Sequence, residues 1–172
     1  MQKFILTLFV VAIAGCAGGV VGNGVERVEL ALMPTTGSKV TGRVTFARTG
    51  EKLRVVAEVS GLTPGLHGFH IHEFGDCSAS DGGSAGGHFN PAGARHGSPD
   101  NAMHHAGDMP QLVADASGVA RLTAYLDGVS LADEAQGIRG RSVVVHAQAD
   151  DFKSQPAGNA GARLACGVIP MR

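Results

Sequence analysis

The segment Gly65-Leu66-His67-Gly68-Phe69-His70-Ile71-His72-Glu73 holds three histidines within six residues. Side chains alternate along a β-strand, so His70 and His72 leave one face while Ile71 points to the opposite, apolar face. Two imidazoles on one face can bind the same ion, which makes this strand a candidate metal site. His67 has the other parity, and we expect it to be a hydrogen-bonded structural histidine.

Strand patterns also dominate the rest of the chain. Apolar residues alternate or run together between turns rich in glycine and proline, which is typical of β-strands. The expected strands are 25–33, 39–48, 53–59, 67–74, 119–126, 141–147 and 163–169. We find no amphipathic helical pattern, no internal repeat and no second domain. The sequence therefore predicts an all-β domain built as an antiparallel sandwich or barrel.

Two irregular stretches, 75–108 and 149–162, interrupt the strand pattern. The first contains eight glycines, and so long a loop is uncommon in a domain unless it is functional. Glycine gives it the backbone freedom to bring spaced ligands together. Metal ligation can order such a loop, because bonds to an ion replace missing backbone pairing.

The candidate ligands form two sets. His146 ends the apolar strand 141–147 and can reach the ion of His70 and His72 across the sheet. The loop contributes four further groups: His88, His96, His105 and Asp108. Three imidazoles and a carboxylate satisfy a closed zinc site, and four imidazoles suit divalent copper. For any single histidine the alternative is a solvated side chain or a cap.

Composition excludes some functions and favours export. Lys+Arg 14 nearly balances Asp+Glu 15, and no basic stripe predicts nucleic-acid binding. Outside the leader, Cys77 and Cys166 form an even pair. In an oxidising compartment we expect them to form a disulfide, the alternative being two buried thiols.

The first residues read as a leader. Residues 4–13 are an apolar run after Lys3, too short to span a bilayer and proportioned like a secretory signal. Ile13-Ala14-Gly15-Cys16 resembles a bacterial lipobox, which predicts cleavage of residues 1–15 and lipidation of Cys16. The alternative is ordinary cleavage after Ala14. Residues 16–24 would be a short tether, and 25–172 the domain.

Five motifs, taken together, resemble the copper/zinc superoxide dismutase family. Besides Gly65 to Glu73 they are Gly87-His88-Phe89-Asn90-Pro91, His105-Ala106-Gly107-Asp108, Val144-Val145-His146-Ala147, and GNAGARLACGVI at 158–169. The resemblance covers residues 25–169, essentially the whole mature chain. It implies an immunoglobulin-like antiparallel Greek-key β-sandwich or flattened barrel of about eight strands with two long functional loops.

The same resemblance implies the reaction and its cofactors. Superoxide would be converted to dioxygen and hydrogen peroxide by a copper ion that alternates between two oxidation states. One copper and one zinc would bind to each subunit. Copper would bind His70, His72, His88 and His146, and zinc would bind His88, His96, His105 and Asp108. His88 would thus bridge both ions and take part in catalysis.

Further roles are implied residue by residue. Asp150 would link His70 and His96, and Arg163 would attract superoxide at the rim of the copper channel, helped by Lys153. Cys77 and Cys166 would form the family's disulfide. The family pattern His-x-Gly-Asp assigns zinc to His105 and leaves His104 as a solvated neighbour.

The sequence departs from the animal enzymes in two places. The stretch between His146 and Arg163 is shorter, and Cys77 follows the His72 strand closely. Both departures leave open whether the chain forms a homodimer. Export to the periplasm or cell envelope, with anchoring through Cys16, is expected. Two alternatives to an enzyme are a domain that stores copper and zinc without turnover, and a secreted sandwich whose zinc only orders a loop.

Overall fold

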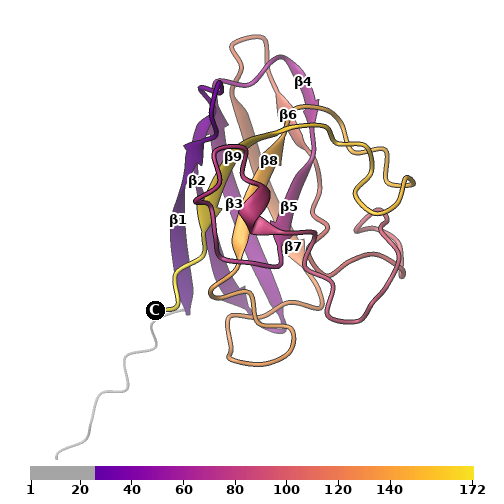
Figure 1. The fold of residues 1–172 in the computed structure, drawn as a ribbon. Coiled ribbons are helices and arrows are strands. Elements are labelled where there is room, and N and C mark those ends of the chain that lie inside the picture. Colours follow the sequence, from indigo (N-terminus) through magenta and orange to yellow (C-terminus); the bar gives the residue numbers. More distant parts are fainter. Residues whose placement is uncertain (1–25) are drawn as a thin grey trace, which may run out of the picture.

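The computed structural model describes residues 26–172, and nine strands account for most of its regular structure (Figure 1). The strands are β1 (Arg27–Pro34), β2 (Thr41–Thr49), β3 (Lys52–Ser60), β4 (Gly65–His67), β5 (Phe69–His72), β6 (Leu112–Ala114), β7 (Ala120–Leu126), β8 (Ser142–His146) and β9 (Arg163–Val168). One short 3-10 helix, η1 (Gly83–Ala85), lies in the first long loop. None of the helical segments in this described part is long and apolar enough to cross a bilayer.

The strands form one antiparallel sheet that nearly closes into a barrel. Their order is β4-β6-β7-β3-β2-β1-β9-β8-β5. The two end strands, β4 and β5, follow each other in the chain with only Gly68 between them. The sheet edges are therefore joined covalently, and the all-β expectation is confirmed. The proposed leader, Cys16 and the tether 16–24 lie outside the described residues.

The expected single strand 67–74 is wrong, because the chain divides there into β4 and β5. The Gly68 amide donates to the Gln148 carbonyl (2.8 Å), and its carbonyl accepts from the His146 amide (2.9 Å). A Cβ on Gly68 would lie only 2.8 Å from the Ala160 Cβ, so glycine permits this close approach. β4 then pairs with β6 and β5 with β8. The three-residue β6 was not anticipated.

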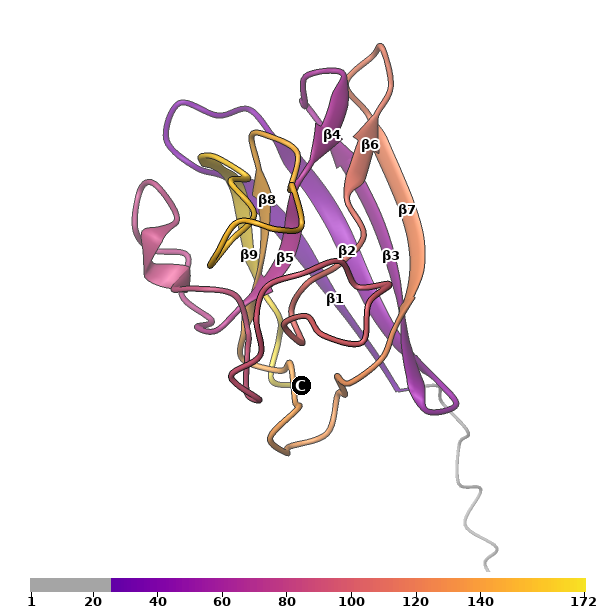
Figure 2. The ribbon, with the colours of Figure 1, turned by 90° about the vertical axis from the view of Figure 1, so that its right-hand side faces the viewer.

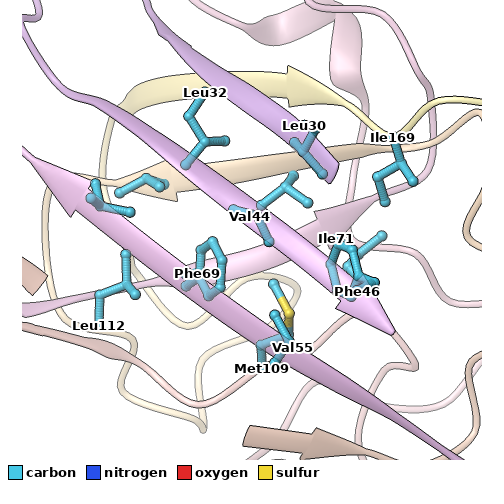
Figure 3. Close-up of a cluster of buried hydrophobic side chains, with 14 of the residues drawn as sticks. Leu30, Leu32, Val44, Phe46, Val55, Phe69, Ile71, Met109, Leu112 and Ile169 are labelled. Carbon is cyan, nitrogen blue, oxygen red and sulfur yellow. The ribbon is translucent and has the colours of Figure 1, made fainter. Parts of the chain in front are cut away.

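Alternation along the strands builds the core. Val28, Leu30 and Leu32 of β1 are buried, as the sequence pattern predicted. Figure 3 shows side chains from strands far apart in the sheet order meeting in one cluster, among them Phe46 from β2 and Ile71 from β5. Each such buried side chain contributes about 1.5–3 kcal/mol. Ile71 thereby anchors β5 from the face opposite its two histidines.

The two long loops lie on the side of the barrel formed by β5, β8 and β9 (Figure 2). The Cys77–Cys166 disulfide ties the first loop to β9 with a Cα–Cα distance of 5.8 Å, so the expected disulfide is confirmed. This side of the barrel also carries the histidines.

Candidate metal centre

Backbone pairing brings the loop ligands to the strand ligands. The free edge of β5 binds loop segments, with the Ile71 amide donating to Gly107 and the Ile71 carbonyl accepting from Phe89. These contacts set His70 opposite Asp108 and His72 opposite His88. The loop is therefore aligned with β5 much as another strand would be.

The first group contains only imidazoles. His70 and His72 of β5 meet His146 of β8 and His88 of the loop, and one ring nitrogen from each lies within 4.8 Å of all the others. All four side chains are buried. The geometry thus unites the four residues that the resemblance assigned to copper.

Hydrogen bonds fix which nitrogens face one another in this group. His72 donates from Nδ1 to the Gly86 carbonyl (2.9 Å), and His146 donates from Nδ1 to the Gly161 carbonyl (3.3 Å). In neutral rings the two Nε2 atoms then carry lone pairs, yet they lie 3.3 Å apart. Two facing lone pairs repel, and a cation bound to both removes that repulsion.

Three more ring nitrogens fit a metal ion. His70 Nδ1, His88 Nε2 and His105 Nδ1 are buried and have no hydrogen-bond partner among residues 26–172. A buried polar atom without a partner is costly, and native proteins rarely keep one without a reason. Each of these three residues belongs to at least one of the two groups, so the donor sets fit bound metals.

The second group adds a carboxylate. His88, His96 and His105 surround Asp108, with Nδ1 to Oδ1 distances of 2.8, 3.0 and 3.5 Å respectively. The other carboxylate oxygen of Asp108 accepts from the amides of Gly97 and His105. This orients the carboxylate into the cluster, which has the donor set of a closed zinc site. His88 belongs to both groups, through Nε2 in the first and Nδ1 in the second.

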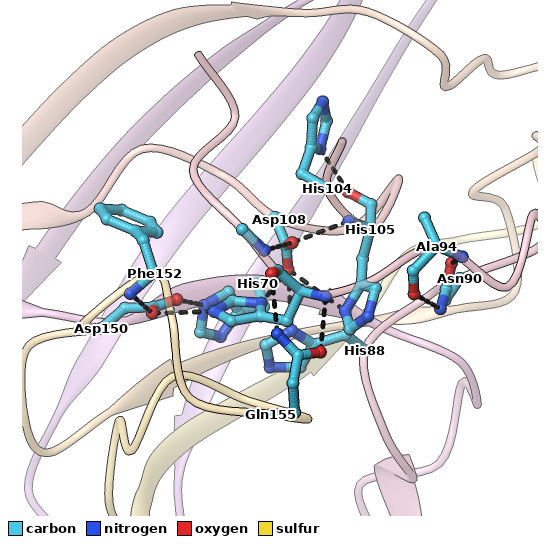
Figure 4. A network of polar contacts seen from close by, with 12 residues as sticks. His70, His88, Asn90, Ala94, His104, His105, Asp108, Asp150, Phe152 and Gln155 are labelled. Carbon is cyan, nitrogen blue, oxygen red and sulfur yellow. Dashed lines mark hydrogen bonds and ion pairs between the residues drawn. The ribbon is translucent and has the colours of Figure 1, made fainter. Parts of the chain in front are cut away.

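Asp150 links the two groups by accepting a hydrogen bond from one histidine of each (Figure 4). His70 Nε2 donates to its Oδ2 at 2.7 Å, and His96 Nε2 donates to its Oδ1 at 2.9 Å. The Asp150 amide in turn donates to the side chain of Gln111, a contact that sequence reasoning missed. Burial alone would raise the pKa of Asp150, but the two imidazoles hold it well below its usual range. Its charge fixes the tautomers of both rings.

The histidines with shifted pKa values fall into two classes, three with a lowered pKa and one with a raised pKa. Burial lowers the pKa of His88 to about 4 and that of His146 to about 3, and it lowers the pKa of His72 well below 6.5. At His96 burial acts in the same direction, but hydrogen bonds to Asp108 and Asp150 outweigh it and raise the pKa to about 9. Without metal, the rings of His72, His88 and His146 are therefore neutral at pH 7.

Arg163 lies beside the four-histidine group. Its Nη1 donates to the Gly82 carbonyl and its Nη2 to the Gly86 carbonyl, both at 2.6 Å, and Gly86 also accepts from His72. Burial lowers the pKa of Arg163 while nearby Asp81 opposes that shift, and the guanidinium stays charged. It lines a hollow of about 430 Å³ together with Thr35, Thr36, Asp81, Gly83, Gly161 and Ala162. Lys153 is exposed and does not line this hollow.

Two histidines lie outside both groups. His67 is buried, with its ring nitrogens against the carbonyls of His146 and Thr63, as expected of a structural histidine. His104 donates from Nδ1 to the His105 carbonyl at 2.6 Å and is half-buried, so it is less solvated than anticipated.

Comparison with known proteins identifies the family. The family model described as copper/zinc superoxide dismutase matches residues 40–169. The chain is 41% identical to an extracellular Cu-Zn superoxide dismutase of Onchocerca volvulus, over 89% of this chain and 80% of that one. It is 38% identical to the protein of the same name from Brugia pahangi, over 81% and 74%. The crystal structure of the clock protein EA4 superposes with a TM-score of 0.77 at 39% identity, covering 86% of this chain and 96% of that one. The chain belongs to the copper/zinc superoxide dismutase family.

Proposed function

We propose that the chain dismutates superoxide, converting two superoxide anions and two protons into dioxygen and hydrogen peroxide. Copper and zinc are its cofactors, and we assign one of each to every subunit. Copper is assigned to His70, His72, His88 and His146, and zinc to His88, His96, His105 and Asp108. The observation that carries this assignment is the single buried ring of His88, which offers one nitrogen to each group.

The protein's own residues prepare the site for this reaction. Bound copper supplies one-electron exchange, and bound zinc supplies a fixed positive charge. His88 can hold a proton at Nε2 and release it toward peroxide, while its Nδ1 stays directed at the Asp108 cluster. The carbonyls of Gly86 and Gly161 keep the Nε2 atoms of His72 and His146 free of protons. The buried cluster thereby keeps its ligand nitrogens available at neutral pH.

The proposed activity is tested on purified protein loaded with both metals. Two measurements are needed, the metal content per chain and the rate of superoxide consumption with peroxide formation. We expect one copper, one zinc and rapid turnover. Two bound metals with negligible turnover would instead indicate storage, and zinc alone would indicate a structural role.

Replacing Arg163 with alanine is expected to lower the rate constant about tenfold at low ionic strength. Net charge is only -1, so attraction of the anion depends on local positive potential, which is worth about ten- to a thousandfold in association rate and fades with salt. The salt dependence should therefore flatten. Arg121→Ala on β7 removes the same charge far from the hollow and serves as the control. An unchanged rate at low salt would remove Arg163 from the mechanism.

We also propose that the protein is exported from a bacterial cell. The relatives from Onchocerca volvulus and Brugia pahangi are named extracellular, which supports export. Residues 1–15 would be the signal, Cys16 the lipidated first residue and 16–24 the tether, placing the enzyme in the periplasm or at the cell envelope, where it would protect against superoxide. Labelling with a fatty-acid analogue tests the anchor, and a Cys16→Ala chain that is labelled equally would contradict it.

A homodimer is proposed from an apolar patch beside β9. Phe74, Val168 and Met171 are 55%, 41% and 65% exposed. They lie on neighbouring segments. A Cβ on Gly75, which follows Phe74, would lie 3.3 Å from Val168 and would overlap the Gly140 carbonyl, and a Cβ on Gly140 would lie 2.6 Å from the Met171 sulfur. Exposed apolar patches often mark interfaces, and two-fold dimers are the commonest homo-oligomers. Sedimentation should give twice the chain mass, and Val168→Glu should give the monomer mass.

A further inference from the structure

The short loop 150–159 is held together by its own hydrogen bonds. The Asp151 carboxylate accepts from the amides of Lys153 and Ser154, from the Ser154 hydroxyl and from the Asn159 side chain. Gly158 closes the loop, since its amide donates to Ser154 and its carbonyl accepts from Asp151. A loop closed in this way can present its remaining side chains in fixed positions.

One of those side chains, Gln155, pairs with the backbone of His96. Its Oε1 accepts from the His96 amide at 2.9 Å, and its Nε2 donates to the His96 carbonyl at 3.0 Å. Nε2 also donates to the Lys153 carbonyl of its own loop at 3.1 Å. Figure 4 shows the Gln155 amide directed into the polar network around the metal groups. A single side chain thus satisfies both backbone polar groups of one residue.

Within residues 26–172, Gln155 is the only hydrogen-bond partner of the His96 backbone. Residues 93–98 form no regular secondary structure, and no backbone–backbone hydrogen bond among residues 26–172 involves His96. The Gln155 amide takes the place that a neighbouring strand takes for His70 and His72. Buried backbone groups need such partners.

The same loop also contacts the ring of His96. Asp150 Oδ1 accepts from Nε2 at 2.9 Å, and the Phe152 ring stacks on the imidazole at a centroid distance of 6.5 Å and 24°. Gly158 has a φ of +62°, and a Cβ there would overlap Asp150 Oδ1. Only glycine lets the loop close over this pair. The ring and the backbone of His96 are therefore held from one side.

We propose that Gln155 is a positioning residue for the zinc site, fixing the backbone of His96 so that its Nδ1 points at the Asp108 cluster. The inference rests on the proposed assignment of His96 to zinc. Residues that orient a ligand typically change metal affinity about 10- to 100-fold when removed. Gln155 lies on the surface and its side chain hydrogen-bonds to His96 and to its own loop, with no member of the four-histidine group among its partners, so its effect should be largest on zinc.

The experiment measures zinc affinity of metal-free protein by competition with a chromophoric chelator. Two variants are compared with the parent: Gln155→Ala removes the side chain, and Gln155→Met keeps its length without its hydrogen bonds. Gln136→Ala, an exposed glutamine whose side chain contacts neither group, is the matched control. A second readout is the visible absorption of Co²⁺ bound in place of zinc, which reports ligand geometry.

We expect both Gln155 variants to bind zinc about tenfold more weakly and to shift the Co²⁺ bands, with the control unchanged. Parent affinity in both variants would overturn the proposal, as would restoration by methionine, since the side chain would then act by packing. Failure of the parent to bind zinc would instead contradict the proposed function. If Gln155→Ala does not fold, the methionine variant still decides between these results.

Discussion

The metal-free protein is expected to be most stable near pH 6.5 and to lose stability on either side. Burial depresses the pKa of His88 from 6.5 to about 4 and that of His146 to about 3. Such groups contribute stability above pH 6.5, and the contribution is lost as the pH falls through the folded value. The shift at His88 alone corresponds to about 3 kcal/mol between pH 6.5 and 4, and His146 acts in the same direction.

His96 has the opposite effect on how stability changes with pH. Its pKa is raised to about 9, so its contribution is complete below pH 6.5 and is lost as the pH rises through 9. The carboxylates of Asp108 and Asp150, whose pKa values lie well below the usual range, lose their contribution only in stronger acid. Because the His96 contribution is complete below pH 6.5, it does not offset the loss at His88 and His146 in the acid range.

Urea unfolding of chelator-treated protein between pH 4 and 9 measures this profile. The protein loaded with both metals is the control, because its ligand nitrogens hold cations instead of protons. The urea concentration at its unfolding midpoint should therefore not change from pH 6.5 to 9. A metal-free midpoint that does not change between pH 6.5 and 4 would show that the histidines are not buried as described.

The strand-borne part of the site could be predicted from local pattern alone. A period of two places His70 and His72 on one face and sends Ile71 into the core, which the structure confirms for Ile71. His146 follows from its place at the end of an apolar strand. These inferences succeed because strand geometry is regular, so spacing in sequence translates directly into direction in space.

The loop-borne part could not be derived in this way. His88 and Asp108 reach the strand ligands because the edge of β5 pairs with the loop, a long-range contact with no local pattern. Their grouping was anticipated only through family resemblance, as was the role of Asp150. Gln111 and Gln155 left no signal, since an isolated glutamine in a loop is ordinarily solvated. The break at Gly68 was missed because its cause, the nearby Ala160, lies far along the chain.

Loss of the Cys77–Cys166 disulfide is expected to lower the free energy of unfolding by about 4.5 kcal/mol at 25 °C. The two cysteines are 89 residues apart, and closing a loop of that length restricts the unfolded chain by about this amount in the chain-entropy model. The disulfide also holds the loop whose Gly82 and Gly86 carbonyls bind Arg163. Its loss should therefore reduce the superoxide rate as well as the stability.

Two comparisons separate the covalent link from the side chains themselves. Urea unfolding of the parent is measured with and without a phosphine reductant, and the double variant Cys77→Ser, Cys166→Ser is measured in the same way. The reductant should lower the stability of the parent and leave the double variant unchanged. Because reduction replaces no residue, a parent that loses less than about 1 kcal/mol on reduction would show that the loop is held by its other contacts. Arg163 would then keep its position through the carbonyls of Gly82 and Gly86 without help from the covalent link.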